Sequence, residues 1–309
     1  MNWLRRWIRG RAARVALTLL LMAVIVSRLD GPTLLTIFQR FDMRYAGAML
    51  CVYGLLLGAF AWRWALIGES LAISASYFQY ARGLWLSQAM GELGPPLLAG
   101  EWARFHALKG QAARSSLLAS QMLDRVSGQI VLVLIVLCLL PAYGPLFSTH
   151  SGFSVHASIL GLLFLLALLA IGLIWVARLT PGLRDQARLS RSILNPLRHP
   201  AHYALSCLIQ ALLVLNWVLA AGGFGLLESS GRVALLAPLL LLGVGSLPGL
   251  VSDWGKREAA AVLILAPAGL SAEESLAVSL VFGTTHLIMA LPGAFFWPRA
   301  QPPRPARAG

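Results

Sequence analysis

The chain has 309 residues, of which 58% are hydrophobic and 12% are charged, and its mean hydropathy is +0.74. Such a chain has too few polar side chains to cover a soluble globule, so a soluble fold is excluded. Its net charge of +13 lies in short clusters between apolar runs, which excludes a broad basic face for nucleic acid and indicates instead the cytoplasmic ends of membrane spans.

The first half of the chain reads as full spans around one interrupted segment. Five arginines and no acidic residue precede the first apolar run, so we expect the N-terminus in the cytoplasm. No small-x-small cleavage site follows this run, so we interpret it as an uncleaved span rather than a signal peptide. A loop over 29–44 is expected outside. The predicted full spans of this half are 15–26, 45–67 and 116–140.

The interruption lies in the apolar segment 77–98, which contains the paired prolines Pro95 and Pro96. A helix cannot continue through both prolines without losing backbone hydrogen bonds. We therefore expect a re-entrant hairpin that enters from the cytoplasm, breaks over 94–100 and begins its second arm at Glu101.

The second half repeats this arrangement. An external loop is expected over 141–157, and the segment 178–198, with five Arg and one Asp, marks the cytoplasmic side. A second hairpin, entering from outside, is expected to break over 248–255. Its arms are 233–247 and 256–267, the full spans are 158–176, 203–224 and 275–297, and a basic, disordered cytoplasmic tail covers 298–309.

An internal sequence repeat relates the two halves. PLLAGEWAR at 96–104 aligns with PGLVSDWGK at 248–256, and ARSSLLAS at 113–120 aligns with AEESLAVS at 272–279. Because each half has an odd number of crossings, the second half must be inverted relative to the first.

The fold class that follows is an all-α polytopic membrane protein with about six full spans, two re-entrant helical hairpins and both termini in the cytoplasm. The membrane domain covers 1–297, with inverted repeats at about 13–143 and 158–297. Interrupted segments at matching places in two inverted halves point to a transport site near the membrane midplane.

Charged residues cluster at the two predicted breaks and early in the span 116–140. They are Glu101, Arg104, Asp124, Arg125, Asp253, Lys256, Arg257 and Glu258. Charges at membrane depth persist only where they pair or line a wet cavity. The N-terminus of a half-helix attracts an anion, and Arg257 would be a bidentate donor to phosphate, so these residues form a candidate site for a lipid head group.

Structural pairing is the alternative for the residues at the breaks. Glu101 would then pair with Arg104, and Arg257 would pair with Glu258 or Asp253. Buried ion pairs of this kind would hold the hairpins together without binding a ligand.

For Asp124 and Arg125 the alternative is capping and interfacial anchoring at the start of a span. Trp102 and Trp254 lie at matching places of the repeat, and tryptophans there more often pack or anchor than form a substrate platform.

No sequence feature indicates an enzyme. The chain has no nucleophile elbow, phosphate-binding loop, paired catalytic carboxylates or zinc motif. Cys51, Cys138 and Cys207 fall inside apolar runs and read as small hydrophobes rather than as disulfide partners or metal ligands. We expect no cofactor and no metal.

Four motifs resemble those of the lysylphosphatidylglycerol synthase transmembrane, or flippase-like, domain family, and the resemblance covers nearly the whole chain. They are GEWARFHALKG at 100–110, SQMLDRVSGQ at 120–129, SLPGLVSDWGKREAAAVLIL at 246–265 and GLSAEESLAVSL at 269–280. The block from SLP to Trp-Gly-x-Arg-Glu is the most specific part.

The resemblance assigns the candidate site residues by position. The family's acid-x-x-Arg, Asp-Arg and Trp-Gly-x-Arg-Glu motifs fall on Glu101 and Arg104, on Asp124 and Arg125, and on Trp254, Gly255, Arg257 and Glu258. Ala99 and Gly100 stand where Gly-Gly is usual, and Asp253 and Lys256 add charge where small or apolar residues are common. These departures bear on which lipid is bound.

The resemblance also implies a function. Family members include the flippase half of bifunctional lysyl-lipid synthases, archaeal proteins of dolichol-linked glycan assembly and proteins associated with hopanoid biosynthesis. We expect no soluble aminoacyl-transferase domain in this chain and therefore no lipid aminoacylation. We expect a flippase-like transporter of the cytoplasmic (inner) membrane that moves or handles an anionic, polyprenyl-linked or glycosylated lipid, with a hopanoid also open.

Two other functions stay open. The first is a non-transporting membrane scaffold that docks a glycosyltransferase or lipid-modifying enzyme through the segment 178–198. The second is an intramembrane enzyme that acts on a lipid head group with Glu258 or Asp253 as base, which ranks last because no nucleophile or metal set accompanies those carboxylates.

Overall fold

The computed structural model describes residues 31–93, 99–148, 200–246 and 253–296, and these residues form helices with no strand among them. The predicted spans 15–26 and 158–176 and the predicted tail 298–309 lie outside the described residues, as do most of the two predicted breaks.

The helices of the first half are α2 (Gly31–Gln39), α3 (Met43–Ser70), α4 (Tyr77–Leu93), α5 (Ala99–Ala107) and α6 (Arg114–Ser148). Those of the second half are α9 (Pro200–Gly223), α10 (Ser230–Ser246), α11 (Asp253–Leu265) and α12 (Ala272–Ala290), with the short 3-10 helices η1 (Leu227–Ser229), η2 (Ala266–Ala268) and η3 (Leu291–Phe296).

Five helical stretches are long and apolar enough to cross a membrane, so the chain is a multi-pass membrane protein. They are Met43–Ser70, Arg114–Tyr143, Pro200–Gly223, Leu227–Val244 and Ala272–Phe296. Four of them match predicted full spans. The fifth, formed by η1 and most of α10, overlaps the first arm of the second predicted hairpin and meets the length of a span.

Two predicted loops are wrong within the described residues. The outside loop 29–44 contains α2, where Pro32 sits in the first turn, the position at which proline favours a helix. The external loop 141–157 begins with helix, because α6 continues through Pro141 and Pro145 to Ser148. Prolines are tolerated in long apolar helices, where leaving the helix would expose a whole turn of backbone groups.

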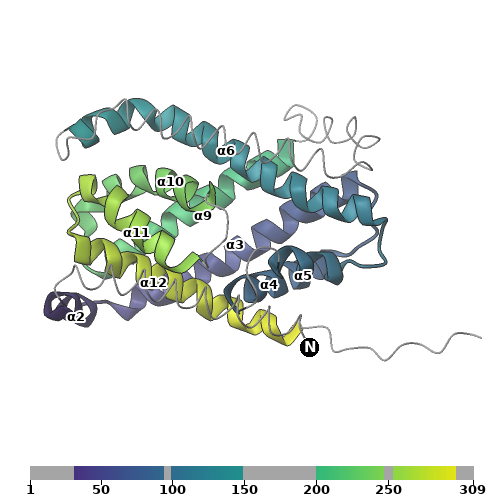
Figure 1. Ribbon diagram of the computed structural model, residues 1–309, viewed down its shortest axis with the longest axis horizontal. Coiled ribbons are helices and arrows are strands. Elements are labelled where there is room, and N and C mark those ends of the chain that lie inside the picture. Colours follow the sequence, from purple (N-terminus) through teal and green to yellow (C-terminus); the bar gives the residue numbers. More distant parts are fainter. Residues whose placement is uncertain (1–30, 94–98, 149–199, 247–252, 297–309) are drawn as a thin grey trace, which may run out of the picture.

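Both halves follow the same order of elements: a long helix, two shorter helices and a second long helix. This order is α3, α4, α5, α6 in the first half and α9, α10, α11, α12 in the second. In Figure 1 the two shorter pairs lie toward opposite ends of the long axis, with α3 and α9 packed together between them.

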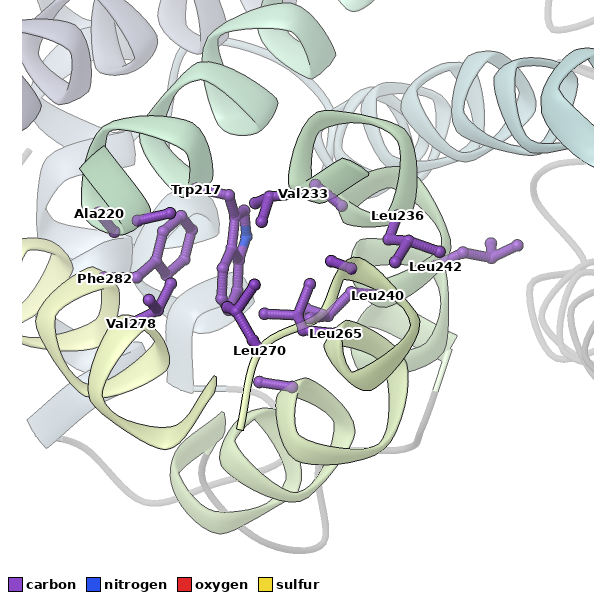
Figure 2. Packing of buried hydrophobic residues seen from close by; sticks show 14 of the residues in the cluster. Trp217, Ala220, Val233, Leu236, Leu240, Leu242, Leu265, Leu270, Val278 and Phe282 are labelled. Carbon is purple, nitrogen blue, oxygen red and sulfur yellow. The ribbon is translucent and has the colours of Figure 1, made fainter. Parts of the chain in front are cut away.

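The largest apolar core joins α9, α10, α11 and α12 to α6. At its centre the ring of Trp217 stacks on Phe282 with centroids 4.4 Å apart. Val233, Leu265 and Leu270 surround the indole (Figure 2). Large aromatic rings dominate the energy of such a core, so this stack fixes the long helices of the second half against each other.

Close backbone approaches hold α4 against its neighbours. A Cβ atom on Gly100 would lie 2.8 Å from the Ser87 hydroxyl oxygen, and one on Gly83 would lie 2.8 Å from the Cβ atom of Ala107. A Cβ atom on Gly293 of η3 would lie 2.1 Å from the backbone carbonyl oxygen of Trp85. Only glycine permits these contacts, so the α4–α5 pair and η3 form a tightly packed unit.

Gly293→Ala is expected to destabilise the protein by about 1–3 kcal/mol, because the added methyl group meets backbone that cannot move aside. Gly91→Ala in α4 is the matched control, since a Cβ atom there meets nothing within 4 Å. Thermal unfolding of the purified variants in detergent measures both. Equal midpoints for the two variants would show that η3 does not pack on α4 as described.

Candidate functional site

A buried cluster of three charges lies where α3, α5 and α6 meet. The Nε atom of Arg63 donates to Asp124 Oδ1 at 2.8 Å, and Nη1 of Arg104 donates to Asp124 Oδ2 at 2.9 Å. The side chains of Arg63 and Asp124 are 3% and 2% exposed, and that of Arg104 is 13% exposed. One carboxylate therefore holds two guanidinium groups from different helices.

This first cluster carries a surplus positive charge. Two arginines face a single carboxylate, and the Nε atom of Arg104 is buried with no hydrogen-bond partner among the described residues. The Arg104 guanidinium also lies over the ring of Trp64, at 5.2 Å from its centroid. A buried donor with no acceptor is destabilising on its own, and a bound anion would satisfy it.

The sequence builds the first cluster through helical spacing and one glycine. Asp124 and Gly128 are four residues apart and share one face of α6. A Cβ atom on Gly128 would lie 2.9 Å from Nη1 of Arg63, so the glycine lets the guanidinium reach across the face. The same Nη1 atom donates to the hydroxyl of Ser206 on α9 at 3.0 Å.

The other two predicted residues of this region form the rim of the cluster. Arg125 makes an ion pair with Glu101, and the Arg125 side chain is 67% exposed. The predicted pairing of Glu101 with Arg104 is therefore wrong, because Arg104 turns inward to Asp124. The capping role considered for Asp124 is also wrong, since this carboxylate is buried among helices well inside α6.

A second cluster lies at the start of α11. Both Nε and Nη2 of Arg257 donate to Glu258 Oε1, at 3.0 and 2.8 Å, as the structural alternative for this pair predicts. Glu258 also accepts from the hydroxyl of Ser279 at 3.2 Å and from the backbone N–H of Gly255 at 2.5 Å. The pair is buried and its charges cancel.

The backbone at the start of α11 explains why glycine stands there. Gly255 has φ 89° and ψ −54°, and Trp254 also leaves helical geometry. Only glycine adopts such a φ without strain. The non-helical residues fall inside the predicted break 248–255. The irregular turn aims the Gly255 N–H at Glu258.

The two pairs of shorter helices meet at Trp254. Its indole Nε1 donates to Oε2 of Glu92 on α4 at 3.1 Å, and the Arg257 guanidinium lies 4.7 Å from the centroid of its ring. Trp254 thus connects the second cluster to the first half of the chain. Lys256 is partly exposed in the first turn of α11, and Asp253 is the first residue of that helix.

Sequence reasoning missed Arg63, Ser206, Glu92 and Ser279 as site residues. A signal for Arg63 was present, because it is the one charged residue in the apolar segment 45–67. A lone arginine in a span needs a buried partner. Contacts between distant segments make Ser206, Glu92 and Ser279 part of the site. A single sequence does not reveal such contacts.

An apolar groove of about 680 Å³ lies between α3 and α9, separate from both clusters. Its lining includes Gly54 and Gly58 of α3 and Leu205 and Leu208 of α9. Glu69 is the charged residue among those that line it. Such a surface suits a hydrocarbon chain.

Comparison with known proteins identifies the family. A family model described as "Lysylphosphatidylglycerol synthase TM region" matches residues 11–293. The chain belongs to this family. Comparisons with curated proteins and with solved structures gave no match. The described residues of this TM-region domain include five long apolar helices, and they contain no group of His, Cys, Asp or Glu that could hold a metal ion.

Asp124→Asn is expected to destabilise the protein strongly, by about 3–5 kcal/mol, because two buried guanidinium groups lose their counter-charge. Glu101→Gln makes the same chemical change at the exposed pair, where the loss is expected to stay below about 1 kcal/mol. Chemical or thermal unfolding of the purified variants compares them. A loss at Glu101 as large as that at Asp124 would contradict the buried cluster.

Proposed function

We propose that this protein is a flippase-like transporter that moves or handles a lipid with an anionic head group across the cytoplasmic (inner) membrane. The observation that carries the proposal is the surplus guanidinium at Asp124, where the buried Nε donor of Arg104 has no acceptor within 31–93, 99–148, 200–246 and 253–296. Membership of a family of transmembrane regions named after a lipid synthase supports it.

The chemistry of the cluster favours phosphate as the anionic group. A guanidinium presents its N–H donors in a fork that matches two oxygens of a phosphate or carboxylate. Arg63 donates from Nε to Asp124 and from Nη1 to Ser206. Arg104 donates from Nη1 to Asp124, so its Nε donor is left for a ligand. A head group that enters the membrane must lose water, and Arg104 would replace part of that hydration.

The proposed mechanism uses the two halves as rocking units. We propose two re-entrant hairpins, α4–α5 and α10–α11, within about six spans, with both termini in the cytoplasm. The equal order of elements in the two halves and the Trp254–Glu92 contact between the shorter pairs support this arrangement. Rocking of inverted halves would expose the cluster to one side of the membrane and then to the other.

The cargo class that we propose is an anionic, polyprenyl-linked or glycosylated lipid, with a hopanoid-related lipid as a further case. The apolar groove between α3 and α9 would accommodate a hydrocarbon chain. We propose no covalent chemistry for this chain, so a glycosyltransferase or another lipid-biosynthetic enzyme would supply or consume the lipid. The scaffold alternative rests on 178–198, which lies outside the described residues.

Arg104→Ala tests the proposal without leaving an unpaired buried charge, because Arg63 and Asp124 remain as a neutral pair. We expect transport of a phosphate lipid to fall about 10-fold or more, as for the loss of one charged hydrogen bond. The measurement is dithionite quenching of fluorescent phosphatidylglycerol in reconstituted vesicles.

Arg125→Ala is the matched control, since Arg125 is an exposed arginine of the rim. Its transport rate is expected to equal that of the unmodified protein. If Arg104→Ala and Arg125→Ala transported the lipid equally well, the surplus charge at Asp124 would have no part in binding the head group.

A further inference from the structure

Helix α9 carries a row of polar side chains on its buried face. His202, Ser206, Gln210 and Asn216 are all buried. The first three are four residues apart along one face of the helix, and Asn216 lies about 40° from His202 around the helix axis, on the same side. The opposite side carries apolar residues such as Leu215, which is exposed. In a helix that crosses a membrane, polar residues placed inside the bundle mark a path or a binding site.

Two side chains of this row have polar atoms with no hydrogen-bond partner in the part of the chain that the structure describes. These atoms are Oε1 of Gln210 and both amide atoms of Asn216, and all three are buried. Folded proteins rarely leave such atoms unpaired unless water or a ligand completes them. The three unpaired atoms of Gln210 and Asn216 therefore indicate a polar occupant.

The row begins at the first charged cluster. Ser206 accepts from Nη1 of Arg63 at 3.0 Å and donates to the backbone carbonyl of His202 at 2.8 Å. Along α9, Gln210 lies about 6 Å from Ser206 and Asn216 lies about 15 Å from it. A head group held at the cluster would thus reach Gln210 first and Asn216 next.

The geometry points to a polar track along α9, formed by Ser206, Gln210 and Asn216, that is hydrated when empty and receives uncharged donor–acceptor groups of the lipid head group. Asn216 offers a donor and an acceptor that are both unpaired, which a hydroxyl group can satisfy together. A phosphate only accepts, so it would leave the Asn216 oxygen unpaired.

This inference rests on the proposed function and narrows its cargo. A lipid that satisfies both places carries a phosphate for Arg104 and hydroxyl groups for Gln210 and Asn216. The class is therefore a phospholipid or phosphorylated lipid with a polyol or sugar head group.

Cysteine labelling tests hydration of the track independently of the lipid. In a background in which Cys51, Cys138 and Cys207 are replaced by Ser, single cysteines at Gln210 and Asn216 are compared with single cysteines at Leu208 and Leu215, which are exposed on the apolar side of α9. The probe is a charged, water-soluble methanethiosulfonate added to reconstituted protein, which reacts with the thiolate that forms only in contact with water.

The expected result is labelling of Gln210→Cys and Asn216→Cys at least about tenfold faster than of Leu208→Cys and Leu215→Cys. Equal rates at all four positions, or labelling only on the apolar side, would overturn the track. This outcome is distinct from failure of the Arg104 comparison, because labelling needs no lipid substrate. If Gln210→Cys and Asn216→Cys are labelled quickly but Arg104→Ala and Arg125→Ala transport lipid equally well, the hydrated track is retained and the anion site at Arg104 is contradicted.

Asn216→Leu provides a second variant that does not depend on labelling. It replaces two unpaired polar atoms with a side chain of similar size, so folding, measured by thermal unfolding, is expected to be retained. Transport of phosphatidylglycerol, whose head group carries hydroxyl groups, is expected to fall about tenfold relative to the Leu215→Ala control. Undiminished transport by Asn216→Leu would contradict the assignment of hydroxyl groups to the track.

Discussion

The structure depends on how one carboxylate buried among the helices balances arginines that cannot lose their charge. Asp124 ties Arg63 of α3 and Arg104 of α5 to α6, and Arg63 extends the contact to Ser206 of α9. Each guanidinium needs a partner where water is scarce, so these contacts fix the relative positions of four helices. Because one carboxylate pairs with two arginines, the cluster that stabilises the bundle also has a net positive charge.

The two clusters differ in how their charges are balanced. This difference distinguishes a cluster with a structural role from one that could bind a ligand. In the second half Arg257 and Glu258 neutralise each other, and Gly255 and Ser279 complete the carboxylate. The pair has little net charge with which to bind a ligand, although the sequence motif indicated Arg257 as a phosphate donor. In the first half the balance is incomplete at Arg104. We therefore propose the lipid site at the first cluster, where the charges do not cancel, rather than at the second cluster, where the sequence motif is most specific.

The sequence predicted the helical class, the family and most described spans because apolar runs of sufficient length have few alternatives in a membrane. The segment 45–67, for example, lies within α3. Ion-pair partners were harder, since Arg63 and Asp124 are 61 positions apart and nothing local joins them. Anchoring was an alternative role for Asp124 because the span was expected to begin at 116, close to it. The sequence shows Gln210 and Asn216 as polar residues in an apolar segment. It does not show that they are buried, because burial depends on how the helices pack.

The most direct measurement is a cryo-EM map of the protein in nanodiscs that contain phosphatidylglycerol. We expect density for a phosphate within hydrogen-bond distance of the Arg104 Nε atom, with the head group continuing toward Gln210 on α9. The same map of Arg104→Ala should lack that density while Arg63 still contacts Asp124. A map in which Arg104 Nε donates to a protein group, with no lipid at the cluster, would contradict a binding site built on surplus charge.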